Sequence, residues 1–251
     1  MKSVILTAPG EFSFSADAKE IPVPGPNQVL IRVECAVINP TDTYYLAGQY
    51  KGEYSYPLVP GLEGSGTVIA SGGGFYAWTL VGKRVSFTRI LERSGKFTKD
   101  GTYAEYCVTD SNKCITLEDN VSFEQAASGV CNPMTALGLL EKVLDKKATA
   151  VIQTAANSQM GRMMNRLLRE NGIQVINIVR KEEQAQALRE KYGTPEQGCH
   201  VLNSEFGNFK DDLKKLAKKL NATVVLECIS GPIVGVISSC LPEKSSIICY
   251  G

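Results

Sequence analysis

This chain has very little histidine and tryptophan, and its positive and negative charges nearly balance. Its 251 residues include one histidine and one tryptophan, and 27 basic against 26 acidic side chains leave a net charge of +1. A surface that binds nucleic acid through bulk charge needs a clear basic excess, so no nucleic-acid partner is expected. A lone histidine also argues against a Ser–His or Cys–His hydrolase, and His200 is expected to be a structural residue of a core strand.

Long apolar runs and paired cysteines are missing as well. No segment approaches the roughly 20 apolar residues that span a bilayer, and the first residues lack the apolar core of a signal peptide. We therefore expect a cytoplasmic protein with no membrane association, or a mitochondrial one whose presequence has been removed. The eight cysteines form no C-x-x-C pair and lie mostly in apolar runs, which predicts reduced, buried thiols.

Short apolar runs between turn residues fill the chain to about residue 125. Glycine and proline separate these runs, and each run alternates over four to six residues. Short strands at such spacing predict a small β-rich domain. The expected strands cover residues 29–33, 66–69, 84–87 and 103–108.

From about residue 147 apolar strands alternate with helical patterns. Near-continuous apolar strands that alternate with helices predict a doubly wound parallel sheet, covered on both faces, and hence an α/β fold. Five lysines in the segment 209–220 are expected on a solvated helix face rather than on a nucleic-acid surface. The expected strands are 150–152, 175–179, 200–202, 223–226 and 246–250, and the expected longer helices are 160–171, 182–192 and 209–220.

The first strand–helix turn of this second half is a candidate dinucleotide site. It retains only Gly161 of the G-x-G-x-x-G pattern, but its small residues would let the backbone approach a pyrophosphate, and the helix N-terminus would attract negative charge. The alternative is an ordinary helix capped by Ser158 or Asn157. The candidate cofactor-binding residues of this turn are Ala156, Asn157, Ser158, Gln159, Met160 and Gly161.

The end of the second strand indicates which dinucleotide would bind. An NAD site carries Asp or Glu about 20 residues on, to hold the ribose 2′-hydroxyl. Here Arg180 stands 19 residues after Gly161, and Lys181 follows it. Because a guanidinium pairs with a 2′-phosphate, the sequence favours NADPH. The alternative is that both cations simply flank a loop.

Seven stretches of the sequence carry a resemblance to a known family, at residues 38–42, 48–50, 60–66, 82–85, 101–106, 132–136 and 155–161. They lie in family order and together resemble the medium-chain dehydrogenase/reductases, in the zinc-free branch of quinone oxidoreductases and 2-enoyl thioester reductases. The resemblance implies a GroES-like catalytic domain at 1–125, a Rossmann NADPH-binding domain at 126–251 and a cleft between them.

Two further expectations come from the same resemblance. Family members continue beyond the point that corresponds to the end of this sequence, so the chain is expected to be truncated at its C-terminus, and a homodimer is expected for a natural-length chain. Where zinc-dependent relatives carry Cys and His ligands, this sequence has Asn39 and Leu62. Only Cys131 matches a ligand position, and because a catalytic zinc needs three protein ligands, no metal is expected.

With hydrolase and zinc chemistry not expected, the remaining candidate reaction is hydride transfer assisted by hydrogen-bond donors. Tyr50 matches the acid-like tyrosine of the enoyl thioester reductases, and its phenol would donate to a developing oxyanion. Asn39 would donate to the substrate carbonyl, and Thr135 would contact the nicotinamide; the alternatives are a loop tyrosine, a turn residue and a helix-start residue. The sequence thus predicts an NADPH-dependent reductase of a quinone or α,β-unsaturated carbonyl. An enoyl thioester reductase and a non-catalytic NADPH-binding protein remain alternatives.

Overall fold

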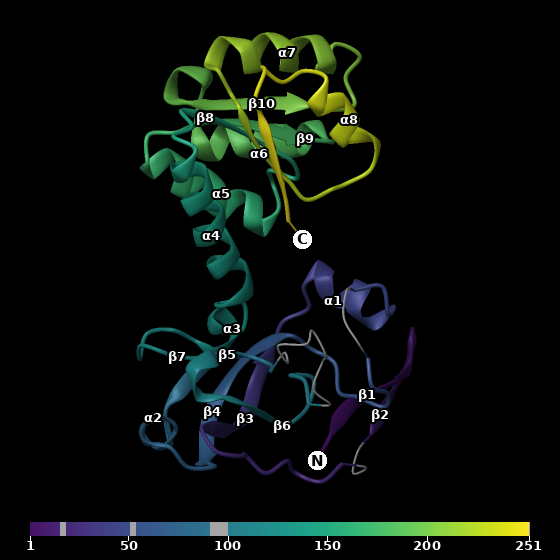
Figure 1. The fold of residues 1–251 in the computed structure, drawn as a ribbon, viewed down its shortest axis with the longest axis vertical. Helices are drawn as coiled ribbons and strands as arrows, with labels where there is room; N and C mark the ends of the chain where they lie inside the picture. Colours follow the sequence, from purple (N-terminus) through teal and green to yellow (C-terminus); the bar gives the residue numbers. More distant parts are fainter. Residues whose placement is uncertain (16–18, 51–53, 91–99, 251) are drawn as a thin grey trace. The chain divides into compact units, whose positions relative to one another are not determined.

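A computed structural model describes residues 1–15, 19–50, 54–90 and 100–250 (Figure 1). The chain divides into two compact units, Met1–Cys131 and Asn132–Gly251. Each unit has its own sheet and its own core, so each is described by itself.

The first unit is built on a five-stranded antiparallel sheet in the order β6-β3-β4-β5-β7. The four expected strands are present, although the last begins at Tyr106 rather than at residue 103. A separate hairpin pairs β1 with β2. The strands are β1 (Ser3–Ala8), β2 (Glu11–Ser15), β3 (Gln28–Ala36), β4 (Glu63–Ser71), β5 (Arg84–Thr88), β6 (Tyr106–Asp110) and β7 (Cys114–Thr116).

Alternation along these strands makes the core of the first unit. Val29 and Ile31 on β3 and Val85 and Phe87 on β5 are fully buried, because residues two apart point to one face of a sheet. A second cluster forms where Leu6, Tyr45 and Leu58 meet. Short helices connect the strands: α1 (Pro40–Leu46), α2 (Phe75–Thr79), η1 (Ser111–Lys113) and α3 (Phe123–Ala126).

The second unit holds a parallel sheet in the order β10-β9-β8-β11-β12. This is the doubly wound arrangement that the strand–helix alternation predicted, and all five expected strands are present. They are β8 (Ala150–Gln153), β9 (Gln174–Val179), β10 (Cys199–Asn203), β11 (Val224–Glu227) and β12 (Ser246–Cys249). The helices are α4 (Cys131–Asp145), α5 (Gln159–Glu170), α6 (Glu182–Tyr192), η2 (Pro195–Gln197), α7 (Phe209–Leu220) and α8 (Pro232–Ser238).

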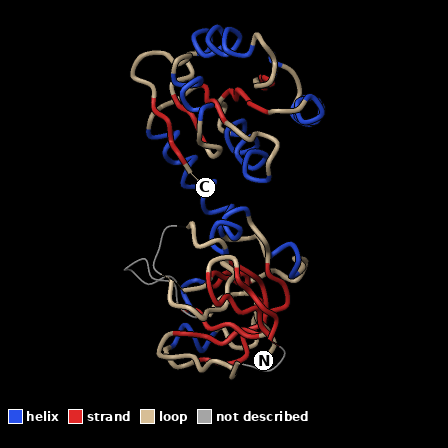
Figure 2. Tube along the Cα trace, turned by 90° about the vertical axis from the view of Figure 1, so that its right-hand side faces the viewer, coloured by secondary structure: helices blue, strands red, loops and turns tan. Residues whose placement is uncertain are grey.

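Helices cover both faces of this sheet (Figure 2). Val151 and Val175 point to the face on which α4 and α5 pack, and Ile152 and Ile176 point to the face under α7 and α8. Helix α6 packs on β9 and β10 through a third cluster that contains Val179, and the hydroxyl of its Tyr192 donates to the carbonyl of Arg162 on α5 at 3.1 Å. Successive side chains of each strand point to opposite faces of the sheet, so the residues of one apolar strand contribute to two cores.

The structure also tests the sequence predictions for His200, for the lysines of α7 and for the cysteines. His200 is buried on β10 beside Gln174, whose Oε1 lies 3.1 Å from its Nε2 atom, and burial lowers the pKa of its imidazole. The lysines of α7 lie opposite its buried residues, as expected. All eight cysteines are free thiols. The expectation of uniform burial is wrong for them, because Cys249 is exposed and three others are half-buried.

Among the described residues, no helix combines the length and the apolar character that crossing a membrane would require.

Candidate functional site

The turn between β8 and α5 has the shape of a dinucleotide-binding turn. Ser158 is the N-cap of α5, and its hydroxyl accepts from the backbone N–H of Gly161 at 3.1 Å. Ala155 has a φ of +46°, and the buried Ala156 donates its N–H to the carbonyl of Ile178 at 3.2 Å. The turn is therefore tied to β9, while the first backbone N–H groups of α5 remain directed away from the helix.

Gly161 is required by the close packing of the helix on this turn. A Cβ atom at position 161 would lie 2.5 Å from the carbonyl oxygen of Ala156 and 2.7 Å from that of Ala155. This is the packing role of the third glycine in the G-x-G-x-x-G pattern. The side chain of Met160, by contrast, is 9% exposed and belongs to the core, so only its backbone could contact a ligand.

Three buried amides lie beneath the turn, between the sheet and α5. Gln153 and Asn165 both donate to Oδ1 of Asn177 at 2.7 Å. Both also donate to the carbonyl of Gly161, at 3.1 and 3.3 Å. All three amide side chains are fully buried. Because Gln153 and Asn177 are cross-strand partners, the network connects the first turn of α5 to β8 and β9 at once.

The carboxyl ends of β8 and β11 hold a second polar network. Thr154 donates to a carboxylate oxygen of Glu227 at 3.3 Å and accepts from the N–H of Cys228 at 3.1 Å. The same Glu227 oxygen accepts from the N–H groups of Ile229 and Ser230 at 2.7 and 3.0 Å. In this strand order the chain reverses its winding between β8 and β11. That is the place where open parallel sheets bind ligands, and Glu227 fixes the loop there.

Arg180 lies one residue beyond β9, beside the dinucleotide turn. Its backbone N–H donates to the side chain of Gln184 at 3.3 Å, and its side chain is exposed. Lys181 follows as the N-cap of α6 and is exposed as well. Since Ala156 bonds to Ile178, the structure brings the end of β9 next to the turn. The predicted turn residues and the predicted 2′-phosphate residue are therefore neighbours.

In the first unit, a buried carboxylate holds Asn39. Asn39 is the N-cap of α1, and its side-chain amide donates to Oε1 of Glu63 at 2.8 Å. The other oxygen of Glu63 accepts from the backbone N–H groups of Val130 and Cys131, at 3.2 and 2.8 Å. Glu63 is fully buried, so a charged carboxylate here depends on these donors.

Burial and this carboxylate shape the acidity of the neighbouring groups. Burial, with an added contribution from Glu63, raises the pKa of the Cys131 thiol to about 12. Burial also raises the pKa of Asp42, while the hydrogen bond from the N–H of Asn39 opposes that shift. Cys131 is therefore a neutral thiol at physiological pH.

Tyr50 lies shortly after α1, at the edge of the tyrosine-rich cluster. Its backbone N–H donates to the carbonyl of Tyr44 at 3.2 Å, and its own carbonyl accepts from the hydroxyl of Tyr54 at 2.7 Å. Its ring is half-buried against the cluster that contains Tyr45 and Leu58. Asn39 and Tyr50 thus flank the same short helix, which brings both predicted oxyanion donors to one part of this unit.

The remaining predicted residue lies in the second unit. Thr135 is the fifth residue of α4 and is exposed. The predicted substrate residues, Asn39 and Tyr50, belong to the first unit, and all predicted cofactor residues belong to the second.

Sequence reasoning missed several residues that the structure places around these sites. Three of them carry a detectable signal, because they are polar residues inside or at the end of an apolar strand. In the run Ala150–Gln153 and in the run Val224–Glu227 the last residue is polar, and Asn177 interrupts a run of Val and Ile. The missed residues are Glu63, Gln153, Thr154, Asn165, Asn177 and Glu227.

Within the described parts of the chain, no three His, Cys, Asp or Glu side chains are arranged to hold a metal ion.

Comparisons with known proteins agree with this architecture. Residues 25–119 match the alcohol dehydrogenase GroES-like domain. A Mesorhizobium loti structure assigned to the NADPH:quinone reductases is 32% identical, with a TM-score of 0.85 over 100% of this chain and 74% of that one. A mycobacterial structure complexed with NADPH is 25% identical, with a TM-score of 0.78 over 100% of this chain and 74% of that one.

A curated relative, the mitochondrial enoyl-[acyl-carrier-protein] reductase of Caenorhabditis elegans, is 29% identical over 91% of this chain and 62% of its own length. The chain spans 50–66% of the length of the curated relatives it matches.

A GroES-like antiparallel unit followed by a doubly wound parallel unit with a dinucleotide turn defines the two-domain dehydrogenase and reductase class. The chain belongs to the medium-chain dehydrogenase/reductase superfamily, in the zinc-free branch that contains the quinone oxidoreductases and the enoyl reductases.

Proposed function

We propose that this protein is an NADPH-dependent reductase that transfers a hydride to a quinone or an α,β-unsaturated carbonyl compound. The observation that carries the proposal is the placement of Arg180, exposed at the end of β9 and next to the Ala156–Gly161 turn. A pyrophosphate would lie against the first N–H groups of α5, and the 2′-phosphate of the same molecule would reach the Arg180 guanidinium. The M. loti relative is named for NADPH and quinone.

Bound NADPH would supply the hydride, and the chain would supply charge stabilisation. Hydride arrival at a conjugated acceptor leaves negative charge on the carbonyl oxygen, so a donor near that oxygen lowers the barrier. Asn39, whose amide is oriented by Glu63, and Tyr50, through its phenol, would be these donors. Thr135 would contact the nicotinamide.

The test is turnover with two acceptors. Oxidation of NADPH is followed with 9,10-phenanthrenequinone and with a crotonyl thioester. NADPH-dependent reduction of at least one acceptor is expected, with NADH clearly poorer. NADPH binding without turnover of either acceptor would instead show a non-catalytic NADPH-binding protein.

Reduction of an enoyl thioester is the second candidate activity. It is favoured by the name of the C. elegans relative, an enoyl-[acyl-carrier-protein] reductase, and by the position of Tyr50 in the sequence. Preference for the thioester over the quinone in the same assay, measured as kcat/KM, would assign the protein to this activity.

A further inference from the structure

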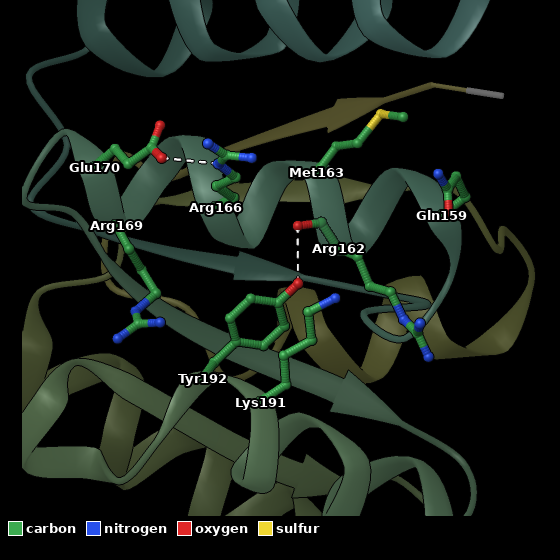
Figure 3. Close-up of a pocket in the computed structure, with 8 residues that line it drawn as sticks. All are labelled: Gln159, Arg162, Met163, Arg166, Arg169, Glu170, Lys191 and Tyr192. Carbon is green, nitrogen blue, oxygen red and sulfur yellow. Dashed lines mark hydrogen bonds and ion pairs between the residues drawn. The ribbon is translucent and has the colours of Figure 1, made fainter. Parts of the chain in front are cut away.

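A basic groove runs along the outer surface of the second unit, between α5 and α6 (Figure 3). It encloses about 580 Å³. Arg162, Arg166 and Arg169 line it from α5, and Lys191 lines it from the end of α6. Glu170 is the one carboxylate among its lining residues. We call this surface, defined by these five residues, the α5–α6 groove.

The charge of the groove stands out against the rest of the chain. Four of its lining residues are cations, whereas the whole sequence has a net charge of +1. The three arginines stand at i, i+4 and i+7 of α5, so their positions share one helix face. The side chain of Arg166 turns toward Glu170, whereas those of Arg162 and Arg169 extend to the other side of the helix (Figure 3). Arginine rather than lysine dominates, which favours carboxylate partners bound through two parallel hydrogen bonds.

Contacts within the chain already hold these side chains in place. Arg162 donates through Nε and Nη2 to the side chain of Asn157, at 3.1 and 2.9 Å. Arg169 and Lys191 lie over the ring of Tyr192, at 5.8 and 5.6 Å from its centroid. Ordering a long cationic side chain upon binding costs entropy, and side chains that are held beforehand lose less. The groove is therefore more ready to bind than a row of freely moving surface cations.

We propose that the α5–α6 groove is a docking surface for an acidic helix of a partner protein. A helix with Glu or Asp at i, i+4 and i+7 repeats the sequence spacing of the three arginines, so a parallel alignment places its carboxylates opposite the three arginine positions. Tyr192 is 9% exposed and lies at the base of the groove between the two helices, beneath Arg169 and Lys191. This inference is independent of the proposed reductase activity.

The test uses two synthetic acidic peptides as probes. One carries glutamates at i, i+4 and i+7 of a helix, and the other has the same composition with its glutamates distributed around the helix. Binding to the intact chain is measured by fluorescence anisotropy at low and at raised ionic strength. We expect the peptide with the matched spacing to bind about tenfold more tightly, with the difference reduced by salt.

Charge-reversal variants test whether the peptide binds in the α5–α6 groove. Reversal of two exposed cations, Arg166→Glu with Lys191→Glu, is expected to weaken the matched peptide by about tenfold or more. The control, Lys214→Glu with Lys218→Glu, makes the same charge change on the exposed face of α7 and should leave the binding unchanged. Glu170→Gln should tighten binding, because it removes the carboxylate that pairs with Arg166 at 2.8 Å. Thermal melts confirm that each variant is folded.

Three results would overturn the proposal. They are equal affinity for the two peptides, equal loss in the α7 control, and binding of a short DNA duplex that matches or exceeds that of the matched peptide. The last would show a general polyanion surface instead of a site for an acidic helix.

Discussion

The side-chain amide of Asn39 donates to the buried carboxylate of Glu63 across 2.8 Å, and the same carboxylate accepts the backbone N–H of Cys131 across 2.8 Å. By resemblance, positions 39 and 131 correspond to two metal ligands of the zinc-dependent relatives. In this chain hydrogen bonds to Glu63 connect the two segments. A buried carboxylate thus holds together a place that those relatives organise around a metal, and it orients a predicted substrate residue.

Replacement of Glu63 by alanine should destabilise the first unit strongly. The change removes the acceptor for Asn39 and for the N–H groups of Val130 and Cys131, and each hydrogen bond to a charged group contributes about 1.5–3 kcal/mol. We expect a loss of at least about 3 kcal/mol in the free energy of unfolding, measured by urea denaturation. Glu105→Ala is the control, because Glu105 also accepts a backbone N–H but is exposed. Equal losses would contradict the interpretation.

The amide network under the turn predicts which of two substitutions lowers the free energy of unfolding more. Asn177→Leu leaves one N–H group on each of two buried amides, Gln153 and Asn165, without an acceptor, since only the carbonyl of Gly161 remains, and should cost about 2–4 kcal/mol. Asn165→Leu should cost less, because it removes one donor together with a buried oxygen that has no hydrogen-bond partner. Urea unfolding of the two variants measures the order, and the reverse order would refute this account of the network.

Arg180→Ala should change the choice of cofactor. A charge-assisted pair with the 2′-phosphate is worth about 1.5–3 kcal/mol, so NADPH should bind about 10- to 100-fold more weakly, while NADH affinity stays nearly constant. Arg189→Ala is the matched control, because Arg189 is paired with Glu182 on α6. Isothermal titration with both cofactors measures the effect. Equal affinity of the unmutated protein for NADPH and NADH would contradict the assignment.

Tyr50→Phe should lower turnover and leave the fold intact. The phenylalanine keeps the ring against the cluster of Tyr45 and Leu58 but removes the phenol that would donate to the oxyanion. Loss of such a group costs about 10²–10⁴-fold in rate. We expect that loss with an enoyl thioester and a smaller one with a quinone, whose product anion is better stabilised. Tyr44→Phe, at an exposed tyrosine nearby, is the control, and an unchanged rate for Tyr50→Phe would make Tyr50 a loop residue.

His200 should make stability depend on pH. Burial lowers the pKa of His200, Lys219 adds to the shift and Glu196 opposes it. The unfolded chain takes up the proton at about pH 6.5, where the folded chain still resists it. The contribution is therefore fully present above about pH 6.5 and is lost as the pH falls through the lowered folded value. Replacement by asparagine should reduce the fall in Tm between about pH 7.5 and pH 5.5. An unchanged fall would show that other groups cause it.

Local pattern was enough to predict most of the fold. The alternation of polar and apolar residues over Arg84–Thr88 and the near-continuous apolar run Val175–Val179 are different patterns, and so indicated the two kinds of sheet. Gly161 could be singled out because a helix start that packs closely on a strand leaves no room for a Cβ. These features depend on neighbours in the sequence, which a single chain displays.

Other features depend on residues that meet only in the folded chain. Glu63 lies in a glycine-rich strand start, and nothing near it in the sequence shows that Asn39, Val130 and Cys131 donate to its carboxylate. The cations of the α5–α6 groove likewise read as two solvated helix faces until the sheet order places α5 beside α6. The sequence by itself therefore determined the class of most elements and singled out the candidate cofactor turn, since those follow from local periodicity and backbone space. The tertiary structure alone decided which buried donors find acceptors and where charge accumulates, because both depend on distances between segments far apart in the chain.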